Sequence, residues 1–209
     1  HTVELVFDVP RGVRLVAEPG VRGEFSIKPE YPWEIDGITI TSYYQMPDGK
    51  IMAWGKCQPG GPCYFESTDG GATWIRPKLG MVEFNGSKEN NLGGPGQFRG
   101  CYDPTAPPEE RFKHVSNAEW SLDEFEKSYK QRRPYQRMAL EISPGVVQSA
   151  WGYTSPDGLR WTRTEEPITV ETCDGGQYVF YDLKLQKYVL IIRSHMTGPR
   201  AEGFEAHSK

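Results

Sequence analysis

Carboxylate and amide side chains gather in three short segments of this chain that end in glycine, PWEIDG, ENNLGG and ETCDGG. Each segment lies where a run of strand-forming residues is expected to begin. The polar side chains are, in chain order, Glu34, Asp36, Asn90, Asn91, Glu171 and Asp174. Two carboxylates, one held protonated and the other ionised, can act as acid and base in a hydrolysis. An aspartate before glycine is also a common turn residue, so a purely structural role stays open for Asp36 and Asp174.

A few isolated side chains could assist such chemistry. Trp33 precedes the first acid and could either stack on a sugar ring or fill the core. Arg193 ends a strand-like run and could pair with a carboxylate of a substrate or of the protein itself. His114 and His195 stand alone, and we assign neither of them a catalytic or metal-binding role. The sequence predicts no metal site and no cofactor.

Three β-hairpins are predicted, each with an aspartate at its turn. GITITSYYQMPDGKIMAWGKC contains two β-rich runs on either side of a Pro-Asp-Gly turn. GQFRGCYDPTAPPEERFKHVSN has the same plan with a longer, proline-rich turn, and QYVFYDLKLQKYVLIIRSH repeats it once more. The turn residues are Asp48, Asp103 and Asp182.

Ser-x-Asp-Gly followed by Trp occurs twice, as STDGGATW at 67–74 and as SPDGLRW at 155–161. In such a turn the aspartate accepts hydrogen bonds from backbone N–H groups, glycine supplies a positive φ, and tryptophan packs over the turn. We therefore expect a structural role for the fixed positions of both copies: Ser67, Asp69, Gly71, Trp74, Ser155, Asp157, Gly158 and Trp161.

One helix is expected at 121–133, in SLDEFEKSYKQRR. Ser121 is a suitable N-cap with Glu124 at the capping-box position, and Phe125 and Tyr129 recur at helical spacing. The helix explains why the second hairpin turn is farther than the first from its Ser-x-Asp unit. Without this insert, the distance along the chain from hairpin turn to Ser-x-Asp unit is similar in the two copies.

Alternating hairpins and Ser-x-Asp turns predict an all-β fold, a β-propeller of four-stranded antiparallel blades. We expect strands at 1–30, one blade at 36–78, a second at 84–166 and part of a third at 171–209. A single domain or fragment of about two and a half blades is expected, because propellers usually need four or more blades to close. A smaller sandwich-like β fold that uses the same turns is the alternative.

The residues at 67–74 match, at every fixed position, the Asp-box (BNR repeat) found in sialidases and related β-propellers. The copy at 155–161 is one residue shorter and lacks the threonine. The stretches that follow, RPKLGMVEFNGSKENNL and TRTEEPITVETCDGGQ, resemble blade connections of bacterial proteins related to glycoside hydrolase families 32 and 43. This resemblance covers most of residues 30–195. Sialidases are more distant, since their Arg-Ile-Pro segment is not found here.

The resemblance implies a five-bladed propeller that hydrolyses glycosidic bonds of an oligo- or polysaccharide in an axial pocket, with the Asp-box turns at the periphery. The implied catalytic residues are Asp36, Asp174, Glu34 and Glu171. The implied substrate-binding residues are Trp33, Asn90, Asn91, Asp103 and Arg193. The sequence departs from the family pattern at two places. It has Asn90 and Asn91 in place of an aspartate, and it has Tyr-Asp-Pro where the family has Arg-Asp-Pro. That departure favours the alternative, a non-catalytic propeller that binds carbohydrate or protein; an inactive fragment of either kind of propeller is the third interpretation.

Composition narrows the remaining classes. A net charge of −4 gives no electrostatic basis for binding nucleic acid, and no apolar run is long enough to span a membrane. The cysteines lack zinc-site spacing. Cys57 and Cys63 could form a disulfide across the CQPGGPC loop or remain as free buried thiols. The family resemblance favours a secreted or periplasmic location.

Overall fold

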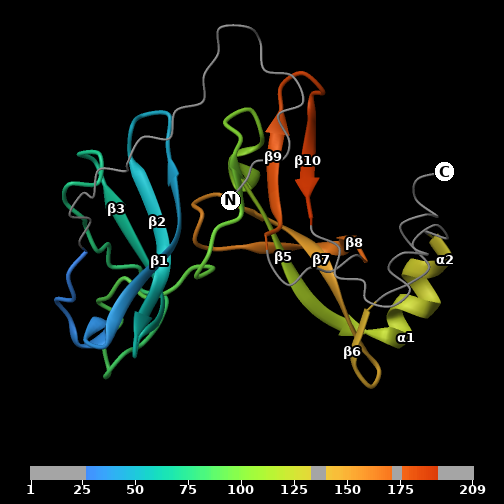
Figure 1. Ribbon diagram of the computed structural model, residues 1–209, viewed down its shortest axis with the longest axis horizontal. Helices are drawn as coiled ribbons and strands as arrows, with labels where there is room; N and C mark the ends of the chain where they lie inside the picture. The colour runs from blue at the N-terminus through green and yellow to red at the C-terminus, as the bar shows by residue number, and fades with distance from the viewer. Residues whose placement is uncertain (1–26, 133–139, 171–175, 193–209) are drawn as a thin grey trace, which may run out of the picture.

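The computed structural model describes residues 27–132, 140–170 and 176–192. These residues form a mostly β fold of antiparallel sheets (Figure 1). The predictions made for 1–26 and for Glu171, Asp174 and Arg193 lie outside the described residues.

Sheet 1 contains three strands in chain order, β1 (Gly37–Gln45), β2 (Ile51–Gln58) and β3 (Gly61–Ser67). The predicted Pro-Asp-Gly turn joins the first two, and Asp48 accepts a hydrogen bond from the Lys50 backbone N–H at 3.0 Å. After β3 the chain passes through the turn 67–74 and returns to the sheet edge, where Ile75 pairs with Glu66. The first predicted hairpin is confirmed.

Sheet 2 has a similar arrangement around two long strands, and it curls strongly (Figure 1). Strands β4 (Gly100–Tyr102), β5 (Phe112–Ser121) and β7 (Val146–Ser155) are neighbours in that order. The turn 155–161 follows β7, and β8 (Thr162–Thr169) then pairs with β7. The short strand β6 (Leu140–Ser143) pairs with the beginning of β7. The second predicted hairpin, β4–β5, is therefore confirmed.

The third hairpin consists of β9 (Tyr178–Asp182) and β10 (Lys187–Ile191). Asp182 accepts hydrogen bonds from two backbone N–H groups in the turn that joins the two strands, as its position predicted. Val179, Leu190 and Ile192 pack against Val115 and Ala150 of sheet 2. This hairpin is confirmed too.

The predicted helix is also confirmed, as α1 (Leu122–Glu124), the π-helical η3 (Phe125–Tyr129) and α2 (Lys130–Arg132) in succession. The side chain of Ser121 caps it by accepting the Glu124 backbone N–H. Phe125 and Tyr129 are buried. Two further single-turn helices, η1 (Pro32–Glu34) and η2 (Pro108–Glu110), precede β1 and β5.

Both Ser-x-Asp turns are held by the same internal hydrogen bonds. The hydroxyl of Ser67 accepts the Gly71 N–H at 2.9 Å, and that of Ser155 accepts the Gly158 N–H at 2.9 Å. Asp69 accepts hydrogen bonds from the hydroxyl and the backbone N–H of Thr73, and these bonds lower its pKa to about 2. Asp157 accepts two backbone N–H groups in the same way.

The two sheets pack through an aromatic cluster that fills the space between them. Trp54 of β2 donates its indole N–H to the carbonyl of Gly158 at 2.9 Å, so the second Ser-x-Asp turn lies against sheet 1 rather than at the periphery. The buried members are Met52, Trp54, Tyr64, Phe98 and Phe112. The opposite face of sheet 1 is covered by loops around Ala53, Cys57, Cys63, Phe65 and Leu92.

Cys57 and Cys63 are both buried and both free thiols, so the disulfide is not formed. A hydrogen bond with Cys57 and burial raise the pKa of the Cys63 thiol, which keeps it protonated. Within the described ranges no helix is long and apolar enough to cross a membrane.

Candidate functional site

The aromatic cluster ends in a polar cavity because the inward-facing row of β2 changes character. Residues two apart on a strand share a face. On β2 this row reads Met52, Trp54, Lys56, and the first two are buried in the cluster whereas the lysine is exposed. One end of the row is therefore core, and the other end lines a cavity.

The facing strand β5 changes in the same way. Its row reads Phe112, His114, Ser116, running from the core into the cavity. His114 lies at the boundary, since its ring contacts Phe98 and Trp161 with centroids 6.0 and 5.2 Å away. The site thus forms where two apolar rows give way to polar residues.

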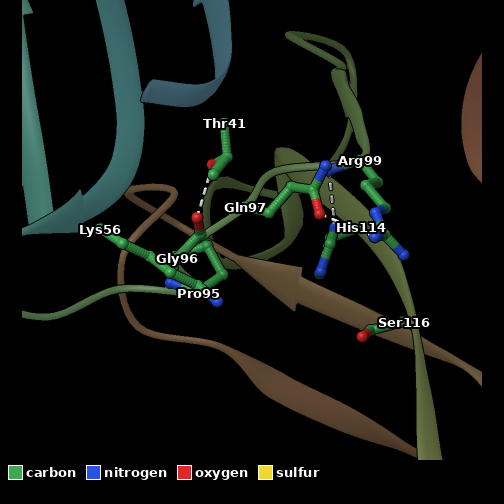
Figure 2. A pocket seen from close by; sticks show the side chains of 8 residues that line it. All are labelled: Thr41, Lys56, Pro95, Gly96, Gln97, Arg99, His114 and Ser116. Atoms are coloured by element: carbon green, nitrogen blue, oxygen red, sulfur yellow. Dashed lines mark hydrogen bonds between the residues drawn. The ribbon is translucent and has the colours of Figure 1, made fainter. Parts of the chain in front are cut away.

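The loop 95–99 crosses between the sheets and closes the cavity. Gly96 offers its carbonyl to the hydroxyl of Thr41 on β1 at 2.6 Å, and its φ of +66° suits glycine. At the other end, the backbone N–H of Arg99 donates to Nδ1 of His114 at 2.9 Å. Figure 2 shows both bonds as dashed lines. The loop therefore fixes the spacing of the two sheets at the site.

The cavity has a volume of about 240 Å³. Pockets for drug-sized ligands are commonly about 300–1,000 Å³, so this cavity suits a smaller group. Besides Pro95 and Gly96, its walls carry six polar side chains (Figure 2): Thr41, Lys56, Gln97, Arg99, His114 and Ser116.

His114 is a neutral hydrogen-bonding group at ordinary pH. Burial and the positive charge of Arg99 lower its pKa to about 4. Because Nδ1 accepts the Arg99 N–H, the proton of the neutral ring lies on Nε2. The ring is therefore fixed in one tautomer and adds no charge to the cavity.

The formal charges of the cavity are both positive. Lys56 and Arg99 contribute an ammonium and a guanidinium, and the described residues that line the cavity include no carboxylate. Arg99 donates to the Gln97 side-chain oxygen at 2.7 Å. Hydroxyl, amide, imidazole and cationic groups together make a site rich in hydrogen-bond donors.

Glu34, one of the predicted acids, lies elsewhere and is fully buried. Its carboxylate accepts a hydrogen bond from Nε of Arg76 at 2.7 Å and another from the backbone N–H of Glu30 at 2.9 Å. The guanidinium of Arg76 also lies over the rings of Tyr31 and Phe65. A carboxylate held in this way is committed to an internal ion pair.

The predicted sugar-binding group around Trp33 comes together, but its polar atoms bond within the protein. The indole N–H of Trp33 donates to Oδ1 of Asn91 at 2.8 Å, and Nδ2 of Asn91 donates to the Tyr64 carbonyl at 2.8 Å. Asn90 donates to the Val82 carbonyl at 3.0 Å and accepts the Leu92 N–H. Both amides are buried, on the loop-covered face of sheet 1.

The remaining predicted acids are dispersed. Asp36 is exposed just before β1. Asp103 is nearly buried in its hairpin turn, where the side chains of Thr105 and Tyr188 donate to it. These hydrogen bonds hold the pKa of Asp103 below its usual value. Neither acid lines the cavity.

A second cavity of about 280 Å³ lies on sheet 1 beside the first Ser-x-Asp turn. Its walls are more apolar and include Ile40, Ile51, Trp74 and Tyr43, the last of which is 72% exposed. It offers an aromatic surface without charged groups. Across the described part of the chain, no group of three or more His, Cys, Asp or Glu side chains could hold a metal ion.

The sequence did not predict the polar cavity. Its charged residues, Lys56 and Arg99, are 43 positions apart and carry no motif. The change from aromatic to polar along the two strand rows is the local signal that could have indicated it. Comparison with known proteins adds no relative: no family model matches the chain, and neither does any curated protein or solved structure.

Proposed function

We propose that this chain is a non-catalytic carbohydrate-binding protein of the β-propeller type, with its ligand in the cavity between sheets 1 and 2. The observation that carries the proposal is the lining of that cavity. It presents hydrogen-bond donors and two cations from sheet 1, the loop 95–99 and β5, and among the described residues no carboxylate pair of the kind glycoside hydrolysis needs lines it. Such a site can hold a hydroxyl-rich ligand, and among the described residues it offers no pair of carboxylates to act as acid and base.

The propeller proposal is supported by the shared plan of the two sheets. Sheet 1 has three antiparallel strands in chain order, and sheet 2 contains a comparable run of neighbours, β4, β5 and β7, with the short β6 inserted between the last two in the chain. In both sheets a Ser-x-Asp turn follows the last of these strands, and the chain then returns to pair with it. The hairpin β9–β10 begins a third unit. On this account the turns 67–74 and 155–161 are Asp-boxes and the sheets are blades.

Saccharide binding measured by calorimetry tests the proposed site. Ser116→Phe places a ring in the cavity and is expected to abolish binding, while Tyr43→Ala alters only the second, aromatic cavity and should preserve it. Thermal melting checks that both variants fold. Loss of binding in Tyr43→Ala with retention in Ser116→Phe would move the site to the aromatic cavity and contradict the proposal.

Hydrolysis is a second proposal because two predicted acids stand at comparable positions in the sequence, each shortly before a strand. Asp36 lies exposed before β1, and Asp174 lies in the segment that precedes β9. Reducing-sugar release from oligosaccharides separates the two functions. The binding proposal expects none from the wild-type protein; release that Asp36→Asn and Asp174→Asn both abolish would instead establish a glycosidase.

A further inference from the structure

The cations of the polar cavity differ from most others in the described residues. Eight basic side chains lie within 4.0 Å of a carboxylate, namely Lys50, Arg76, Lys78, Lys113, Lys127, Lys130, Arg132 and Arg160. Among described residues no such partner is found for Lys56 or Arg99, although the chain as a whole carries an excess of acids. The two unpaired charges are in the same cavity.

Their proximity has an electrostatic consequence. A sphere of the cavity's volume, about 240 Å³, is about 8 Å across, which is close to the Debye length of physiological salt. Lys56 and Arg99 line this one cavity, so an anion bound between them is attracted by both positive charges.

Neutral groups complete the anion site. With its proton on Nε2, the His114 ring can only donate from its free nitrogen. Ser116 and the amide of Gln97 add further donors beside the two cations. A planar guanidinium such as that of Arg99 can bind two oxygens of one acid group at once.

We propose that the cavity selects saccharides that carry an acid group, and that Lys56 and Arg99 bind the oxyanion. This inference rests on the proposed carbohydrate-binding function and narrows its ligand. The acid group is a carboxylate of a uronic acid or a sulfate ester, which share the oxyanion that the cations recognise.

The test compares four probes by calorimetry in low and moderate salt: a galacturonic acid trimer, a sulfated galactose trimer, a neutral galactose trimer and sodium sulfate. Lys56→Gln and Arg99→Gln are the site variants. Lys88→Gln is the matched control, since Lys88 is exposed and outside the cavity.

An acidic trimer is expected to bind at least about tenfold more tightly than the neutral trimer, and added salt should weaken it. Each site variant should lose about tenfold in affinity for the acidic trimer, and the control less than about twofold. Lys56 is exposed, so Lys56→Gln keeps the test valid even where Arg99→Gln disturbs folding. The acidic trimer that binds with the higher affinity identifies the acid group that the cavity prefers.

Other outcomes distinguish failure of the acid selectivity from failure of the proposed carbohydrate-binding function. Equal binding of acidic and neutral trimers at this cavity overturns the acid selectivity and leaves the carbohydrate function standing. Binding of sulfate alone, lost in Lys56→Gln, supports an oxyanion site and overturns carbohydrate binding. Binding of no probe overturns both.

Discussion

Replacing Arg76 by methionine is expected to destabilise the protein strongly. Methionine retains the apolar length of the side chain but, among the described residues, leaves the fully buried carboxylate of Glu34 with the Glu30 backbone N–H as its one hydrogen-bond partner. Breaking a buried ion pair by removing one member costs about 3–5 kcal/mol. The free energy of unfolding of Arg76→Met should fall by that amount.

In a chain of this size, each kcal/mol lowers the melting temperature by roughly 2–4 °C, which predicts a loss of about 6–20 °C. The double variant Glu34→Leu/Arg76→Met removes both charges together. Because replacing a whole buried pair by apolar residues is often neutral, we expect it to regain most of the loss. Urea denaturation of the two variants measures the difference.

The reasoning is refuted if Arg76→Met unfolds within about 1 kcal/mol of wild type, or if the double variant is less stable than the single one. The pair packs beside loops on the face of sheet 1 opposite the polar cavity. Folded Glu34→Gln should therefore bind saccharide as wild type does. Loss of saccharide binding in that folded variant would instead return Glu34 to the functional site.

Three further predictions concern the repeated turns and the buried imidazole. Ser155→Ala removes the hydroxyl that accepts the buried Gly158 N–H, so urea denaturation should show a loss of about 1–3 kcal/mol; an unchanged midpoint contradicts this. Gly158→Ala places a Cβ 3.1 Å from Trp54 at a φ of +74°, and should destabilise more than Gly49→Ala, whose positive φ has nothing within 4 Å. His114 has a pKa near 4 in the folded protein and about 6.5 when unfolded. As the pH falls, the unfolded chain therefore takes up the proton before the folded protein does. Acidification from pH 6.5 to 4 should remove roughly 3 kcal/mol of stability from the wild type, and His114→Gln should not show this loss.

Features set by neighbouring residues were predictable from the sequence. The hairpin turns at Asp48, Asp103 and Asp182 were confirmed because a turn depends on side chains that bond to their own backbone. The helix was found from Ser121, whose cap bond spans only three residues. Local chemistry of this kind is complete within one segment.

Features that depend on distant partners were not predictable. Glu34 was read as a candidate acid because its ion-pair partner, Arg76, lies 42 residues away in the chain. The polar cavity was missed for the same reason, since β2, the loop 95–99 and β5 each supply only part of it. Only the packing of sheet 1 against sheet 2 brings Lys56 and Arg99 to one place.

Mapping backbone amide shifts by NMR during titration with a galacturonic acid trimer tests the central claim most directly. The account predicts that the signals of Gly96, Arg99 and Ser116 move together and saturate, because these residues line the polar cavity. Signals of Tyr43 and Gly70, at the aromatic cavity, should stay in place. Movement confined to those two, with the first three unchanged, would contradict the assignment of the site.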